Sequence, residues 1–187
     1  MAFAHSLRRK YSTLELPPTL TAIAGVGAVV LLYFLYQLAR NEAVFVPLPQ
    51  RTIDEMLRMA EIKNGDVLYD LGSGDGRVLV AAARQYHVRA VGFEKSKVLA
   101  WLSRRRIARN GLKDKVHVVN ADFFSQDLSE ATVITAYLSQ KINNRLEEKL
   151  QRELKKGTRI LSADHTFNFT EEGKIKTGHF WTHLYVT

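Results

Sequence analysis

The chain has 187 residues and a formal net charge of +8, with 46% hydrophobic and 25% charged residues. This length predicts one domain with, at most, a short additional segment. The composition is that of a globular protein, which excludes wholesale disorder and a coiled coil. Because the chain has no cysteine, disulfides and thiol nucleophiles are excluded. The six histidines show no spacing typical of metal ligands, so we expect no metal site.

Near the N-terminus, residues 16–39 form a run without a single charged side chain. A helix of roughly 20 apolar residues can cross the hydrocarbon core of a bilayer, and Pro17 and Pro18 suit the start of a helix. We therefore predict a basic N-terminal segment over residues 1–15, a single transmembrane anchor over 16–40 and a catalytic domain over 41–187. A signal peptide fits poorly, because the run is long and does not end in small residues, whereas the basic start also suits a mitochondrial presequence.

Downstream of this run, apolar segments alternate with helical patterns. The predicted strands are 66–71, 88–93, 116–120, 131–137 and 158–162, and the predicted helices are 76–85, 96–110 and 143–155. This alternation predicts an α/β fold, with a parallel sheet and helices on both of its faces. The last segments, 174–177 and 179–186, predict an antiparallel hairpin that closes the sheet.

The first strand runs into a glycine-rich turn with the sequence Asp70-Leu-Gly-Ser-Gly-Asp-Gly-Arg77. Alternate glycines allow a tight turn and a close approach of a ligand to the backbone. The GxGxG spacing differs from the dinucleotide fingerprint, and the carboxylates of Asp70 and Asp75 would repel a pyrophosphate. A cationic sulfonium with an amino-acid tail, as in S-adenosylmethionine, suits this field better.

Acidic residues also follow the next two strands. Glu94 can accept hydrogen bonds from ribose hydroxyls, and Asp122 can accept one from an adenine amino group. Asp75 and Asp122 are equally well explained as helix N-caps. Acids at the ends of three successive strands, beside a glycine turn, favour one shared nucleoside site.

From Phe45 to the C-terminus the chain resembles the small class I protein-lysine methyltransferases. This group includes archaeal broad-specificity enzymes and mitochondrial enzymes that methylate the ATP synthase c subunit and the adenine nucleotide translocase. The matching stretches are Phe45-Val-Pro-Leu-Pro49, Asp70–Arg77, Asp127-Leu-Ser-Glu-Ala-Thr-Val-Ile134, Leu150–Arg159 and His183-Leu-Tyr-Val186. Relatives usually carry a Ser-His-acid-Phe run and a downstream Trp after the fifth strand, whereas this chain reads Ser162-Ala-Asp-His-Thr-Phe-Asn-Phe169 and lacks the Trp.

The resemblance implies a seven-stranded Rossmann-like sheet, with S-adenosyl-L-methionine as the cofactor. The residues that it implies for the cofactor are Asp70, Gly72, Ser73, Gly74, Glu94, Asp122 and Pro47, with the segment 45–49 lying over the cofactor as a lid. On the acceptor side, a lysine must lose its proton before it can be methylated, since its ordinary pKa is about 10.4. Tyr137 and Asp164 are the candidate catalytic residues, with His165 beside them. An ordinary strand-end aromatic and loop caps explain the three equally well.

The leading hypothesis is a membrane-anchored, S-adenosylmethionine-dependent protein-lysine methyltransferase. Its expected partners are a protein with an acceptor lysine and membrane lipids around the N-terminal helix, and no nucleic acid is expected. The catalytic domain is expected to face the cytosol or the mitochondrial matrix, where the cofactor is available. The alternatives are a methyltransferase of a small molecule, lipid or quinone and a non-enzymatic cofactor-binding scaffold. The basic cluster Arg104–Arg106 with Arg109 is either a solvated helix face or a patch for acidic lipids or an acidic substrate.

Overall fold

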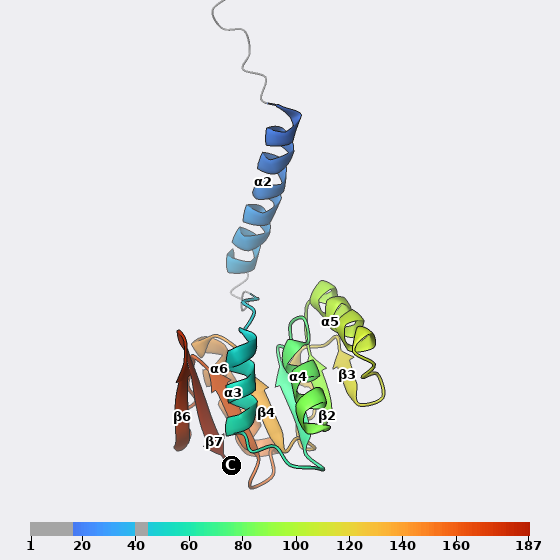
Figure 1. Cartoon of the computed structure of the whole chain (residues 1–187). Coiled ribbons are helices and arrows are strands. Elements are labelled where there is room, and N and C mark those ends of the chain that lie inside the picture. The colour runs from blue at the N-terminus through green and yellow to red at the C-terminus, as the bar shows by residue number, and fades with distance from the viewer. Residues whose placement is uncertain (1–16, 40–44) are drawn as a thin grey trace, which may run out of the picture. The chain divides into compact units, whose positions relative to one another are not determined.

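The computed structural model of the protein describes residues 17–39 and 45–187, and the chain divides into two compact units, 1–44 and 45–187. The described part of the first unit is the helix α2 (Pro18–Ala39) (Figure 1). The predicted anchor does form a helix. Among the described residues, however, no helix meets the length and hydropathy of a membrane span, so the spanning part of that prediction is not supported. The predicted basic segment over residues 1–15 lies outside the described residues.

The second unit is built on one seven-stranded sheet with the order β3-β2-β1-β4-β5-β7-β6. The strands are β1 (Val67–Leu71), β2 (Arg89–Phe93), β3 (Val116–Val119), β4 (Val133–Ala136), β5 (Arg159–Ala163), β6 (Glu171–Thr177) and β7 (Phe180–Val186). The first five are parallel, and β7 runs antiparallel between β5 and β6. The predicted parallel sheet and its closing hairpin are therefore confirmed.

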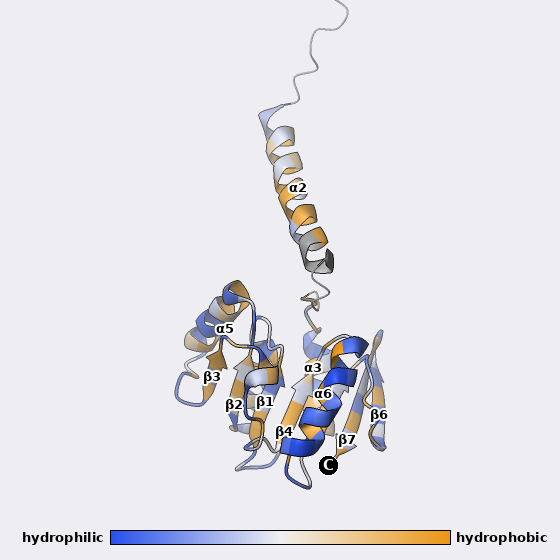
Figure 2. Cartoon of the chain, turned by 180° about the vertical axis from the view of Figure 1, so that it is seen from behind, coloured by the Kyte–Doolittle hydropathy of each residue, from blue (hydrophilic) through white to orange (hydrophobic). Residues whose placement is uncertain are grey.

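Helices cover both faces of this sheet. They are α3 (Gln50–Met59), α4 (Arg77–Tyr86), α5 (Lys97–Arg109) and α6 (Gln140–Glu153), with a short 3₁₀ turn, η1 (Phe123–Ser125). One core joins α3, α4 and α5 to the sheet, and the other joins α6 and the 123–131 loop to its opposite face. Figure 1 shows the α3–α4 side and Figure 2 the α6 side. Because both faces are covered, the central strands are mostly apolar, and all five residues of β1, Asp70 included, are buried.

Two elements differ from the expectation. The helix α3 was not predicted, although Ile53, Met56 and Leu57 follow the i, i+3, i+4 pattern of an amphipathic helix and are fully buried. The strand β6 begins at Glu171 rather than at 174, because its pairing with β7 continues past the irregularity at Glu171 and Gly173. Backbone pairing between strands extends β6 into a polar stretch that carries no apolar alternation.

Candidate functional site

The glycine turn leaves the carboxyl end of β1, where β1 lies between β2 and β4. Gly72, Gly74 and Gly76 all have positive φ angles, of 79°, 53° and 77°, which glycine adopts without a steric penalty. The N–H groups of Gly72 and Ser73 both donate to the Phe93 carbonyl, at 2.9 and 3.1 Å. The turn is thereby tied to the end of the neighbouring strand.

Glu94, directly after β2, supports the same turn. Its Oε2 accepts from the Gly74 N–H and its Oε1 from the Ser96 N–H, both at 2.8 Å. Each carboxylate oxygen has two lone pairs, so Glu94 retains capacity for two further donors. The predicted ribose acceptor therefore also has a structural role that the sequence analysis missed.

Asp70 is the predicted site residue with the most perturbed ionisation. It is only 5% exposed, and its Oδ1 accepts from the Thr135 hydroxyl at 2.8 Å across the β1–β4 pair. Burial raises the pKa of Asp70 to about 7, and the negative charges of Glu94 and Asp75 act in the same direction, against the Thr135 hydrogen bond. No cation compensates this carboxylate within the described residues, so a positively charged ligand would favour its ionised form.

Asp75 behaves differently, and the alternative interpretation of it as a helix N-cap is wrong. It is not the N-cap of α4, since that position is Gly76. It is also not an uncompensated charge, because Arg77 binds both of its oxygens at 3.0 and 2.8 Å and Arg106 binds Oδ2 at 2.6 Å. Burial alone would raise the pKa of Asp75, but the hydrogen bonds and charges of the two arginines lower it.

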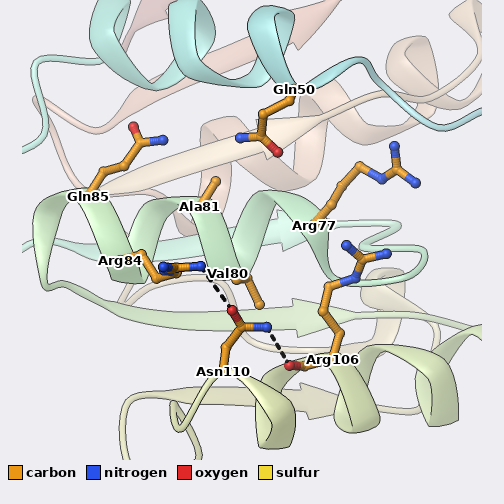
Figure 3. Close-up of a pocket in the computed structure, with 8 residues that line it drawn as sticks. All are labelled: Gln50, Arg77, Val80, Ala81, Arg84, Gln85, Arg106 and Asn110. Atoms are coloured by element: carbon orange, nitrogen blue, oxygen red, sulfur yellow. Dashed lines mark hydrogen bonds between the residues drawn. The ribbon is translucent and has the colours of Figure 1, made fainter.

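A groove of about 470 Å³ lies beside these arginines, between α3, α4 and α5 (Figure 3). Its lining residues are Gln50, Arg77, Val80, Ala81, Arg84, Gln85, Arg106 and Asn110. Figure 3 shows the Arg84 guanidinium directed at Asn110, whose Oδ1 it contacts at 3.1 Å. Since Arg77 and Arg106 are engaged with Asp75, this groove is part of the support behind the glycine turn rather than the nucleoside site.

Asp122 follows β3 and has the role that the alternative interpretation assigned to it. Its Oδ1 accepts from the Phe124 N–H at 3.0 Å and so caps η1, while its Oδ2 lies 3.9 Å from Lys95 Nζ. Because β3, β2 and β1 are neighbours, Asp122, Glu94 and Asp70 stand along one edge of the sheet. The predicted alignment of three carboxylates is therefore present.

The segment before α3 lies over the glycine turn. A Cβ added to Gly74 would overlap the Phe45 ring, so that ring packs directly on the turn. The Leu48 carbonyl accepts from Arg77 Nη1 at 2.9 Å, whereas Pro47 is exposed. Arg77 therefore connects this segment to Asp75, a role that no sequence pattern indicated, although Arg77 belongs to the quoted motif.

The two candidate catalytic residues are brought together. Tyr137 follows β4 and Asp164 follows β5, the adjacent strand. Burial raises the pKa of the Tyr137 hydroxyl, and the charge of Asp164 and a hydrogen bond to it raise it further. The phenol therefore remains protonated over the neutral pH range, close to the Asp164 carboxylate.

Asp164 is itself held in an uncommon conformation. Its φ is 60°, and it exchanges two hydrogen bonds with Trp181: its N–H donates to the Trp181 carbonyl at 2.8 Å, and its Oδ1 accepts the Trp181 N–H at 2.9 Å. A positive φ outside glycine is rare and often marks a position with a function. His165 instead contributes its backbone carbonyl, which accepts from Asn143 Nδ2 at 3.1 Å.

These features fit S-adenosylmethionine. The turn has bare glycine backbone at which an added side chain would meet Leu138 or Phe45, and the Ser73 hydroxyl is buried without a partner among the described residues. The nearby acceptors are carboxylates, which match a ligand with a sulfonium, an amino group and ribose hydroxyls. The described residues contain no group of three or more acids and histidines that could hold a metal ion.

Comparison with known proteins agrees with this geometry. The family model described as "ANTKMT methyltransferase domain" matches residues 70–172. A protein-lysine N-methyltransferase of Saccharolobus islandicus is 36% identical over 148 residues, which cover 76% of this chain and 92% of that protein. A human lysine N-methyltransferase that is named for the c subunit of ATP synthase is 32% identical over 123 residues, which cover 66% of this chain and about half (52%) of the human protein.

A solved structure of similar size is described as an RNA methyltransferase from Salinibacter ruber in complex with S-adenosyl-L-homocysteine. It is 35% identical, has a TM-score of 0.74, and the match covers 75% of this chain and 93% of that one. The fold, the glycine turn and the family match all indicate a class I methyltransferase. This chain belongs to the ANTKMT methyltransferase domain family and is an S-adenosylmethionine-dependent class I methyltransferase.

Proposed function

We propose that the chain is a protein-lysine N-methyltransferase. The observation that carries the proposal is that Tyr137 and Asp164 lie together at the ends of the adjacent strands β4 and β5, beside the glycine turn, where the Asp164 charge acts on the phenol. The name of the S. islandicus relative, which the chain matches over 92% of its length, supports the same acceptor.

In this proposal the edge of the sheet binds the cofactor. Asp70 faces its positive charge, Gly72, Ser73 and Gly74 form the backbone cradle, and Glu94 accepts from the ribose. Asp122 accepts from the adenine amino group, and the segment with Pro47 closes over the ligand. Bound S-adenosylmethionine would supply a methyl group on a sulfonium. This methyl group can pass directly to the acceptor, with S-adenosylhomocysteine as the leaving group, so no covalent enzyme intermediate is needed.

The residues of the chain then have to prepare the acceptor. A lysine arrives as an ammonium ion, and partial burial beside aromatic rings lowers its pKa toward neutrality. The Asp164 carboxylate and the Tyr137 oxygen can accept hydrogen bonds from this nitrogen and direct its lone pair at the methyl group. Phe180, whose ring lies edge-on to Tyr137 at 6.1 Å, contributes apolar surface on one side. Positioning of this kind supplies most of the rate enhancement in a direct displacement.

A second candidate acceptor is RNA, because the S. ruber structure is described as an RNA methyltransferase. The basic cluster on α5 gives this alternative little support. Arg104 donates to the Val118 carbonyl at 2.9 Å and Arg106 binds Asp75, so two of its four arginines are engaged within the fold. Methylation of a small molecule or lipid would use the same cofactor site, and it differs from lysine methylation only in the acceptor.

The test is transfer of isotopically labelled methyl groups. The purified full chain is incubated with labelled cofactor and, separately, with a protein extract, total RNA and a lipid extract. Mass spectrometry then locates the label. We expect label on lysine side chains of proteins, and none in any arm with the Asp70→Asn variant. Label confined to RNA or lipid would overturn the lysine proposal while leaving the methyltransferase assignment intact.

We further propose that α2 associates the enzyme with a membrane, with the catalytic unit on the cofactor-containing side, the cytosol or the mitochondrial matrix. The support is the exposure of its apolar side chains, including Ile23, Val26 and Val29, along a helix without charge. Exposed apolar surface of this extent requires cover. Extraction of membranes at alkaline pH tests this association, and protease accessibility of a C-terminal tag in sealed vesicles tests the side. Release of the protein by salt alone would contradict it.

A further inference from the structure

The outer face of α5 has a feature that the methyltransferase fold does not explain. Val98, Trp101 and Leu102 lie at helical spacing i, i+3, i+4 and are 67%, 51% and 41% exposed. The opposite face of the helix is buried against the sheet through Ala100, Ser103 and Ile107. A helix at the edge of a domain ordinarily turns polar residues outward. This one places an aromatic and two aliphatic side chains there.

The charged residues of α5 itself are all positive. The 13 residues of α5 include no acid. Arg105 lies over the Trp101 ring at 4.7 Å, and Arg109 continues the same face one turn further on. Among the described residues, Lys97, Arg105 and Arg109 take part in no ion pair. We call Val98, Trp101, Leu102, Arg105 and Arg109 the α5 stripe.

An anionic lipid surface matches this combination. Tryptophan prefers the boundary between headgroups and acyl chains, aliphatic side chains insert below it, and cations bind the anionic headgroups. A second copy of this chain would bring like charges together. An acidic protein surface would satisfy the cations but not the exposed aliphatic residues. We propose that the α5 stripe docks the catalytic unit onto the surface of an anionic lipid bilayer, independently of α2 and of the nature of the methyl acceptor.

The test uses the two tryptophans of the full chain as reporters. The Trp181→Phe variant leaves Trp101 as the only tryptophan. It is mixed with vesicles of brominated phosphatidylglycerol and phosphatidylcholine, or of brominated phosphatidylcholine alone. We expect quenching of Trp101 fluorescence only in the vesicles that contain phosphatidylglycerol. Trp101 lies on the stripe itself, so its quenching reports contact of the stripe with the acyl chains, whereas α2 and the basic segment 1–15 are the same in every variant.

Charge removal gives the matched comparison, measured by vesicle binding of full-length variants. Each basic residue near an anionic surface contributes about fivefold to binding, so Arg105→Gln/Arg109→Gln should reduce the phosphatidylglycerol-dependent binding by about 25-fold. Lys141→Gln/Lys156→Gln removes the same charge from exposed positions on α6 and the turn after it and should leave Trp101 quenching in place. Two results would overturn the proposal: equal quenching of Trp101 in both vesicle types, or an unquenched Trp101 in the Trp181→Phe variant together with a quenched Trp181 in the Trp101→Phe variant. Binding to acidic proteins without any quenching by lipid would assign the stripe to a protein partner and would overturn it as well.

Discussion

Asp70, at the end of β1, and Asp75, in the turn that follows, are five positions apart, yet their pKa values are displaced in opposite directions. Asp75 is held by the guanidinium groups of Arg77 and Arg106, which lower its pKa, whereas Asp70 is buried with a single hydroxyl donor, and its pKa rises to about 7. The uncompensated carboxylate is the one at the end of β1, beside the bare glycine backbone. The negative charge of the turn is therefore available at one position, and the other carboxylate serves the fold.

The first prediction concerns stability without cofactor. Because the folded-state pKa of Asp70 exceeds its unfolded value, folding is favoured by the protonated form, and this contribution is lost as pH rises from about 4 to about 7. Asp70→Asn removes the dependence and should be more stable than the wild type above pH 7, by at most about 4 kcal/mol. Urea denaturation between pH 5 and 8 measures it. Asp66→Asn should instead be less stable than the wild type at neutral pH. Hydrogen bonds and the charge of Arg159 lower the pKa of Asp66 despite its burial, so its ionised form stabilises the fold.

The second prediction concerns cofactor affinity. The ionised form of Asp70 is the one that attracts a cationic ligand, so affinity should increase as pH rises through about 7. The dissociation constant of the wild type should be about tenfold larger at pH 6 than its limiting value above the pKa. Isothermal titration gives the values. Asp70→Asn should bind weakly at every pH, and a wild-type curve that is flat from pH 5.5 to 7.5 would remove Asp70 from the binding site.

The third prediction separates Asp75 from Asp70. Asp75→Ala leaves two partly buried arginines without their anion and should lower the free energy of unfolding by about 1–2 kcal/mol. Its effect on cofactor affinity should be less than tenfold, because its charge is already compensated. Arg84→Gln is the matched control, since Arg84 contacts the exposed Asn110 side chain, and it should change stability by less than about 0.5 kcal/mol. If Asp75→Ala lost more cofactor affinity than Asp70→Asn, Asp75 and not Asp70 would be the carboxylate that binds the cofactor.

The fourth prediction concerns the contact between Phe45 and Gly74. Gly74→Ala adds a Cβ that overlaps the Phe45 ring at a φ of +53°. It should destabilise the protein by about 1–2 kcal/mol for the backbone conformation alone and weaken cofactor binding in addition. Gly111→Ala has a similar φ of +68° with no atom near the added Cβ, so it reports the backbone cost by itself. Gly74→Ala/Phe45→Ala should recover the part due to the overlap; identical behaviour of the Gly74 and Gly111 variants would exclude a role for the contact.

The fifth prediction concerns the acceptor side. Tyr137→Phe removes the hydroxyl that lies near the Asp164 carboxylate and should lower kcat by about 10- to 100-fold, with the cofactor dissociation constant unchanged. The pKa of Tyr137 is raised, so its proton is retained and the loss should be the same at pH 7 and pH 9. Tyr69→Phe, in the core on the other face of the sheet, is the control. A fall in cofactor affinity with kcat intact would place Tyr137 in the cofactor site.

Much of the fold followed from local patterns. Apolar strands that alternate with amphipathic helices identify a parallel sheet, because the side-chain periods of strands and helices differ and a strand covered on both faces is mostly apolar. The glycine spacing located the turn, since positive φ angles restrict the residue type. The helix α3 was missed because its apolar positions are few among ten residues, and its polar remainder resembles a loop.

The site itself depended on residues that are distant in the sequence. Arg106 reaches Asp75 across 31 positions, and Tyr137 meets Asp164 only because β4 and β5 are neighbours in the sheet. The sequence by itself determined which carboxylates stand at the strand ends. Which of them keeps an uncompensated charge was decided by the tertiary structure, because a pKa depends on burial and on partners within a few ångströms, and the pairing of strands and the packing of helices set those distances.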